Sequence, residues 1–221
     1  MGGIAIVLAA ATGWVAAHLR GGLAFSDQAA IIWLTVFVLA AIGFLDDYLK
    51  VKRQHNRGIF WKKKGWITFG ITICLTLILA ASTGVVETIS FTRAMSPGWD
   101  ISGPLFVVWT ALMVWSTTNA VNVTDGLDGL AAGIVAIGAG AFFLYSQELT
   151  ARDLLLPSNV GPLFAIIAVG VCVGFLPHNF NPARIMMGDG GALLLGLLLA
   201  AATSVVGGRA DSFNQEFVGQ T

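Results

Sequence analysis

Long apolar runs separated by short polar segments dominate this chain, and they predict helices that cross a membrane. Spanning the hydrocarbon core of a bilayer takes about 20 mostly apolar residues, and every backbone polar group there must be hydrogen-bonded within the protein. Seven runs meet this requirement: residues 2–19, 29–45, 66–86, 104–118, 127–146, 160–176 and 191–206. We therefore expect an all-α fold, a polytopic integral membrane helix bundle with about seven transmembrane helices in this chain.

The fourth run is short and continues into a polar stretch that contains Thr117, Thr118, Asn119 and Asn122. Side chains of this kind are costly against lipid. We therefore expect this end of the helix to face protein or a water-filled cavity.

The composition excludes a soluble globular domain. Of the 221 residues, 56% are hydrophobic and only 11% are charged, whereas about 25% are charged in soluble proteins. Lys and Arg together number 12, as do Asp and Glu, and a net charge of zero argues against a nucleic-acid partner. The 27 glycines fit closely packed membrane helices. Cys74 and Cys172 lie in apolar runs, so we expect two small buried side chains and no disulfide.

The charges that remain are unevenly distributed. Seven of the 12 basic residues fall within residues 46–65, and the positive-inside rule makes this segment a cytoplasmic loop. Alternating through the spans places residues 119–128 and 178–190 on the same side. Five aspartates then share one membrane face: Asp46, Asp47, Asp125, Asp128 and Asp189.

Each of these acidic segments also has a purely structural interpretation. Asp46 and Lys50 have the i,i+4 spacing of a helical ion pair, and the aspartates in the glycine-rich turns could cap helices. We favour one shared site, because three separate structural roles would otherwise have to coincide on one face. A transporter or channel module would place carboxylates nearer to mid-span, and a structural subunit would need none of them for activity.

Carboxylates and asparagines beside a basic segment are suited to a magnesium and phosphate site. Mg²⁺ prefers oxygen ligands and binds through one or two carboxylates together with substrate phosphates. Phosphoryl transfer needs charge neutralisation, which a metal ion and basic side chains supply. The histidines fall in different loops with no cysteine beside them, which disfavours zinc.

Three segments, residues 44–50, 119–131 and 179–191, resemble in this order the polyprenyl-phosphate N-acetylhexosamine-1-phosphate transferase superfamily (glycosyltransferase family 4). These membrane enzymes join a sugar-1-phosphate from a UDP-sugar to a lipid phosphate and release UMP. Residues 1 to about 145 are most similar to the phospho-N-acetylmuramoyl-pentapeptide transferases, which make lipid I for peptidoglycan. Residues 177–185 are more similar to undecaprenyl- or decaprenyl-phosphate N-acetylglucosamine-1-phosphate transferases, so the sugar remains open between the two.

The resemblance implies a role for each matching residue. Asp189 would bind Mg²⁺, and Asp47, with Asp46 beside it, would act as base or nucleophile on the lipid phosphate. The nucleotide and metal pocket would be lined by Asn119, Asn122, Asp125, Asp128 and Asn179. Phosphates would contact Lys50 and one of Lys62, Lys63 or Lys64, among which Lys62 is our candidate.

The resemblance also implies substrates, location and extent. We expect a UDP-activated N-acetylhexosamine and a polyprenyl phosphate as substrates, and a multi-pass protein of the cell membrane with its active site on the cytoplasmic face. Homodimers are common in the family. The family has one span before the position of Met1, and further spans with a histidine-bearing loop after the seventh. We therefore expect residues 1–221 to be one domain truncated at both ends, from a roughly ten-span enzyme, and inactive or barely active alone.

Overall fold

The computed structural model describes residues 2–21, 27–53, 61–83, 88–89, 99–101, 103–152 and 160–207. These residues form seven helices and one short pair of strands. The helices are α1 Gly2–Gly21, α2 Asp27–Arg53, α3 Trp61–Thr83, α4 Pro104–Thr124, α5 Leu130–Ala151, α6 Gly161–Asn179 and α7 Gly188–Gly207. The strands β1 Thr88–Ile89 and β2 Trp99–Asp100 are antiparallel, with Thr88 opposite Asp100. The expected all-α bundle is confirmed.

The helices have the length and composition of membrane spans. Six of them, α1 to α6, are long and apolar enough to cross a membrane, and the apolar part of α7, Gly188–Ser204, is shorter. Each of the seven apolar runs corresponds to one helix. The chain therefore has the architecture of a multi-pass membrane protein.

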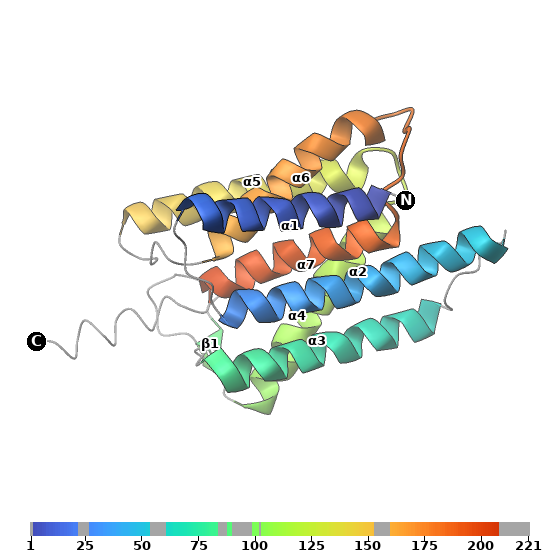
Figure 1. Ribbon diagram of the computed structural model, residues 1–221. Helices are drawn as coiled ribbons and strands as arrows, with labels where there is room; N and C mark the ends of the chain where they lie inside the picture. Colours follow the sequence, from blue (N-terminus) through green and yellow to red (C-terminus); the bar gives the residue numbers. More distant parts are fainter. Residues whose placement is uncertain are drawn as a thin grey trace, which may run out of the picture.

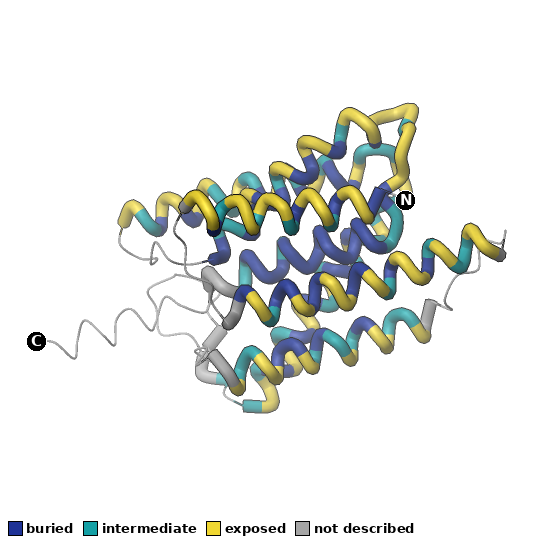
Figure 2. Tube along the Cα trace, viewed as in Figure 1, coloured by how far each residue is buried: buried dark blue, intermediate teal, exposed yellow. Residues whose placement is uncertain are grey.

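Helix α7 forms the centre of the bundle and packs against α1, α2, α4, α5 and α6 (Figure 1). Figure 2 shows burial along most of α7, while the outer helices keep exposed faces. Five leucines of α7 are fully buried: Leu193, Leu194, Leu195, Leu197 and Leu198. A helix surrounded by protein has no lipid-facing or polar side, which explains why α7 is apolar all round. Its first turn is thereby held in the middle of one end of the bundle.

The helices continue beyond the apolar runs, which corrects the expected loop of residues 46–65. Residues 46–53 belong to α2 and residues 61–65 belong to α3, whereas residues 54–60 lie outside the described part. Charged residues extend a helix readily once it leaves the apolar layer, because i,i+4 ion pairs support it. Similarly, α4 runs on to Thr124.

The prediction that both cysteines are buried was wrong for one of them. Cys172 is buried, but Cys74 is exposed.

Helices α2 and α7 approach each other closely at this end of the bundle. A Cβ atom on Gly43 would lie 2.5 Å from the Cα atom of Gly190, which is closer than packed carbon atoms can come. Glycine at position 43 therefore lets the end of α2 lie directly against the first turn of α7. This contact brings Asp46 and Asp47 of α2 beside Asp189 of α7.

Candidate active site

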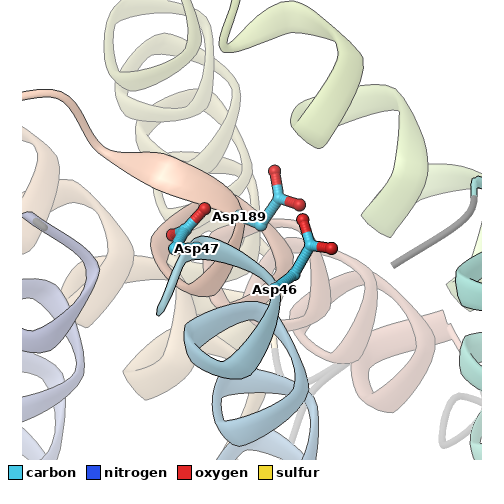
Figure 3. A group of neighbouring side chains, drawn as sticks. All are labelled: Asp46, Asp47 and Asp189. Carbon is cyan, nitrogen blue, oxygen red and sulfur yellow. The ribbon is translucent and has the colours of Figure 1, made fainter. Parts of the chain in front are cut away.

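Three aspartates meet where α2 ends and α7 begins. Asp46, Asp47 and Asp189 each offer a carboxylate oxygen within 4.8 Å of the others (Figure 3). Asp46 is almost fully buried, with 1% of its side chain exposed, and the other two are partly buried. Figure 3 shows the carboxylates of Asp46 and Asp189 coming together, with Asp47 on the other side of the end of α2.

Two lysines are embedded among these carboxylates. The Lys50 Nζ atom lies 2.6 Å from Asp46 Oδ2, 3.8 Å from Asp47 Oδ1 and 3.3 Å from Asp189 Oδ2. Lys64, from α3, bonds to Asp189 Oδ2 and lies 3.9 Å from Asp46 Oδ2. We call these five residues the carboxylate–lysine cluster. Buried charges require such pairing, and among the described residues three carboxylates here face two ammonium groups.

Helix α4 contributes an amide to the cluster. With its amide oriented to satisfy both partners, Asn122 donates to Asp189 Oδ1 (3.0 Å) and accepts from Lys64 Nζ (3.3 Å). The expectation that the polar end of this helix faces protein is therefore confirmed for Asn122. By contrast, Asn119 Nδ2 donates to the Trp115 carbonyl of its own helix, at 2.8 Å.

Asp125 lies in the turn after α4 and contacts the start of α7. Its Oδ2 atom accepts a hydrogen bond from the Gly188 N–H at 3.0 Å. Burial raises the pKa of Asp125 to about 6, the charges of Asp189 and Asp47 add to the effect, and the Gly188 hydrogen bond opposes it. Without a cation nearby, an ionised Asp125 side chain therefore destabilises the folded state.

Asp128 and Asn179 connect two polar segments to each other. Asp128 Oδ2 accepts from Asn181 Nδ2 (3.2 Å) and from the Ala183 N–H (3.0 Å). Asn179, buried at the end of α6, accepts from the Gly129 N–H at 3.1 Å and donates to the Ile185 carbonyl at 3.0 Å. These bonds hold the turn after α4 against residues 180–187. Whether either side chain also contacts substrate remains a prediction.

The structure thus brings some of the expected residues together and separates others. Asp46, Asp47, Asp189, Lys50 and Asn122 share one site, with Asp125 beside it. Asn119 faces its own helix, and the side chain of Lys62 lies outside the described residues.

Of the two adjacent lysines whose side chains are described, Lys63 is exposed and Lys64 lies in the cluster. A signal for this choice is present in the sequence. Thr68, Thr72 and Thr76 follow Lys64 at intervals of four and are all buried. Polar residues at this spacing share one helix face, so the threonines mark the packed face of α3 and Lys64 lies on it.

The residues of the cluster fit a bound magnesium ion. Carboxylate oxygens are ligands that Mg²⁺ prefers, and those of Asp46, Asp47 and Asp189 gather here.

The architecture and site define a class of protein: a multi-pass helical membrane protein with a carboxylate–lysine cluster where four helices meet at one end of the bundle. Residues 29–207 match the model of glycosyl transferase family 4, and the chain belongs to this family. The matched stretch contains every residue of the cluster. The resemblance found in the three sequence segments is thereby confirmed.

The chain is similar to several proteins named phospho-N-acetylmuramoyl-pentapeptide-transferase. The chain is 33% identical to the phospho-N-acetylmuramoyl-pentapeptide-transferase of Frankia casuarinae, over 93% of this chain and 62% of the relative. It is 35% identical to the protein of the same name from Clavibacter sepedonicus, over 91% and 63%. The corresponding protein of Heliobacterium modesticaldum is 39% identical over 78% and 51%. The chain therefore spans 62 to 63% of the length of the first two relatives.

Proposed function

We propose that this chain forms the catalytic part of a membrane enzyme that transfers a sugar-1-phosphate from a UDP-sugar to polyprenyl phosphate and releases UMP. We further propose phospho-N-acetylmuramoyl-pentapeptide as the transferred group, which yields lipid I for peptidoglycan synthesis. The observation that carries the proposal is the carboxylate–lysine cluster, which lies entirely within the family match. The name that the relatives share supports the choice of sugar.

Asp189 is our candidate magnesium ligand, with Asp46 or Asp47 as a second. All three offer oxygen atoms in one place, and magnesium typically binds through one or two carboxylates and the phosphates of its substrate. When bound, the ion would supply neutralising charge for the pyrophosphate and the departing UMP.

Asp47 is our candidate for the group that acts on the acceptor phosphate. The Nζ atom of Lys50 lies 3.8 Å from the Oδ1 atom of Asp47. As a base, Asp47 would take the proton of the acceptor phosphate, whose oxygen attacks the β-phosphorus of the UDP-sugar and displaces UMP. As a nucleophile, it would first attack the β-phosphorus itself, releasing UMP and forming an aspartyl phospho-sugar. The acceptor phosphate would then attack the same phosphorus, taking the sugar-1-phosphate and freeing the carboxylate. Lys50 and Lys64 would attract phosphate oxygens in either route.

We also propose that the cluster faces the cytoplasm in the cell membrane. The basic residues that surround it support this orientation, because positive charge is retained on the cytoplasmic side.

Replacing the candidate metal ligand tests the proposal. In membranes that contain the full-length protein, Asp189→Asn should lower magnesium-dependent UMP release by about 100-fold or more, because the amide cannot balance the charge of the ion. Glu148→Gln is the matched control, because Glu148 is an exposed carboxylate that pairs with Arg152 at the far end of α5. Full turnover by the Asp189→Asn protein would contradict the metal assignment.

UDP-N-acetylglucosamine is the second candidate donor, favoured by the similarity of residues 177–185 to the corresponding enzymes. Both donors should be assayed with the same polyprenyl phosphate. We expect the N-acetylmuramoyl-pentapeptide donor to give the larger kcat/KM, and a reversed ratio would assign the other sugar.

A further inference from the structure

Trp115 of α4 is hydrogen-bonded to the backbone of α3 directly beside Lys64. Its indole Nε1–H donates to the Gly65 carbonyl at 3.0 Å and to Thr68 Oγ1 at 3.2 Å. Its ring packs edge-on against Phe69, with the ring centroids 5.6 Å apart. Trp115 therefore joins α4 to the turn of α3 that carries Lys64.

Thr68 reinforces the same turn from within α3. Its side chain is buried, and its hydroxyl lies 3.0 Å from the carbonyls of both Lys64 and Gly65, to which it donates. A hydroxyl can also accept, so the same oxygen receives the Trp115 N–H. Glycine is one of the least favourable residues inside a helix, and Gly65 lies at the centre of this turn. The geometry of the turn thus depends on bonds from these two side chains.

Helix α4 holds Lys64 at two points. Trp115 and Asn122 are seven residues apart, which is close to two full helical turns, so they lie on one face of α4. Trp115 holds the backbone beside Lys64, and the Asn122 amide accepts from the Lys64 Nζ atom at 3.3 Å. The ammonium group fixed in this way bonds to Asp189 in the carboxylate–lysine cluster.

We propose that Trp115 is a positioning residue, which acts through α3 to hold Lys64 against Asp189. This inference rests on the proposed function, in which Lys64 attracts substrate phosphate oxygens. A displacement of about 1 Å at a reacting group can lower a rate 100-fold, and the Trp115 N–H restrains the backbone one residue away from Lys64. If Trp115 served only to fill space, any aromatic ring would do the same.

Trp115→Phe separates the hydrogen bond from the ring. The variant keeps a ring beside Phe69, and Thr68 still donates to the Gly65 carbonyl, so the fold should be little affected. In membranes that contain the full-length protein, we expect kcat for UMP release to fall about tenfold, because Lys64 is no longer held in place.

Trp33→Phe is the matched control. Trp33 is 5% exposed, and within the described part of the chain its Nε1 atom makes no hydrogen bond. It lies on α2, 13 residues before Asp46. This variant should lose at least as much stability as Trp115→Phe, because Trp33 is the more buried ring, while its kcat stays unchanged. An equal loss of kcat in the two variants would overturn the inference.

A double-mutant cycle shows whether Trp115 acts through Lys64. Residues that act through one another have non-additive effects on activity. In a Lys64→Ala protein, Trp115→Phe should therefore lower kcat no further. A second loss of the same size as in the unaltered protein would contradict the positioning role.

Acetylation of lysines tests the position of Lys64 without any turnover. The full-length protein in detergent is treated with the N-hydroxysuccinimide ester of acetic acid, and each lysine is followed by mass spectrometry. Trp115→Phe should speed the labelling of Lys64 about threefold, which corresponds to the net value of one hydrogen bond. Lys63, which is exposed, is the internal control and should label at the same rate in both proteins. Unchanged labelling of Lys64 would overturn the inference.

The two kinds of measurement separate this inference from the proposed function. Faster labelling of Lys64 in a protein whose unaltered form releases no UMP would support the role of Trp115 and contradict the proposed function. UMP release that is equally fast with and without the Trp115 N–H would contradict the inference alone.

Discussion

Gly188 determines how closely Asp47 can approach the first turn of α7. Its φ of +74° lies in the left-handed region, which glycine adopts without strain. A Cβ atom here would also collide with the Asp47 carboxylate. The same residue donates its N–H to Asp125, so one glycine links two of the acidic side chains.

Asp125 should make the stability of the protein depend on pH. Its pKa is raised from 3.8 to about 6, so the fold favours the protonated carboxyl. The resulting stabilisation is complete below pH 4 and is lost as the pH rises to about 6. Asp125→Asn keeps an acceptor for the Gly188 N–H without the charge. Without magnesium, we expect this variant to gain about 1 kcal/mol relative to the parent at pH 7.5, but little at pH 4.

The measurement is thermal unfolding in detergent at both pH values with a chelator present. A gain of this size corresponds to about 2–4 °C in Tm. The two proteins have all their other titratable groups in common. The pH dependence of the difference between their Tm values therefore reports on Asp125. A difference in Tm that is the same at both pH values would contradict the assignment.

At the scale of elements, the ends of α4 and α6 are joined through side chains. Asn179 supplies one acceptor and one donor to two backbone groups of different segments, the N–H of Gly129 and the carbonyl of Ile185. Asp128 adds two further bonds to residues 181 and 183. These contacts position the polar segment that leads into α7.

Removing the Asn179 amide should therefore loosen this region. Asn179→Ala leaves two part-buried backbone groups without this partner, and because water can reach part-buried groups the cost should be near the lower end of ~1–3 kcal/mol for each. We expect a lower Tm and faster proteolysis within residues 180–187. Asn119→Ala is the control, because within the described part of the chain that amide bonds to the Trp115 carbonyl alone, and its loss should cost less than about 0.5 kcal/mol. Equal effects of the two substitutions would argue against the role of Asn179.

At the scale of the whole molecule, α2, α3, α4 and α7 all contribute side chains to one end of the bundle. Helix α7 is central because it packs against α1, α2, α4, α5 and α6. A single membrane orientation therefore decides which compartment the whole site faces.

The orientation can be measured by cysteine labelling. In a protein with Cys74 and Cys172 replaced by alanine, Lys63→Cys marks the exposed surface near the cluster and Arg152→Cys marks the opposite end. A membrane-impermeant maleimide should label position 63 in inside-out vesicles, and position 152 in intact spheroplasts. The reverse pattern would place the cluster outside the cell.

The seven helices were predictable because length and apolarity are local properties of a chain. The Asp46–Lys50 pair was predictable as well, since the i,i+4 spacing alone places the two side chains on one face. The charge bias indicated that the aspartates share one end of the bundle, and this is where the structure has them.

Contacts within that end were decided only by tertiary packing. The rotation of each helix about its axis determines that Lys64 and Asn122 reach Asp189 while Asn119 turns back to its own helix. That rotation depends on which neighbours cover each face. The close approach of Gly43 to Gly190 sets the spacing of the carboxylates. The sequence by itself thus determined the spans and the charged end, while the shape of the site came from helix contacts distant along the chain, which no local pattern encodes.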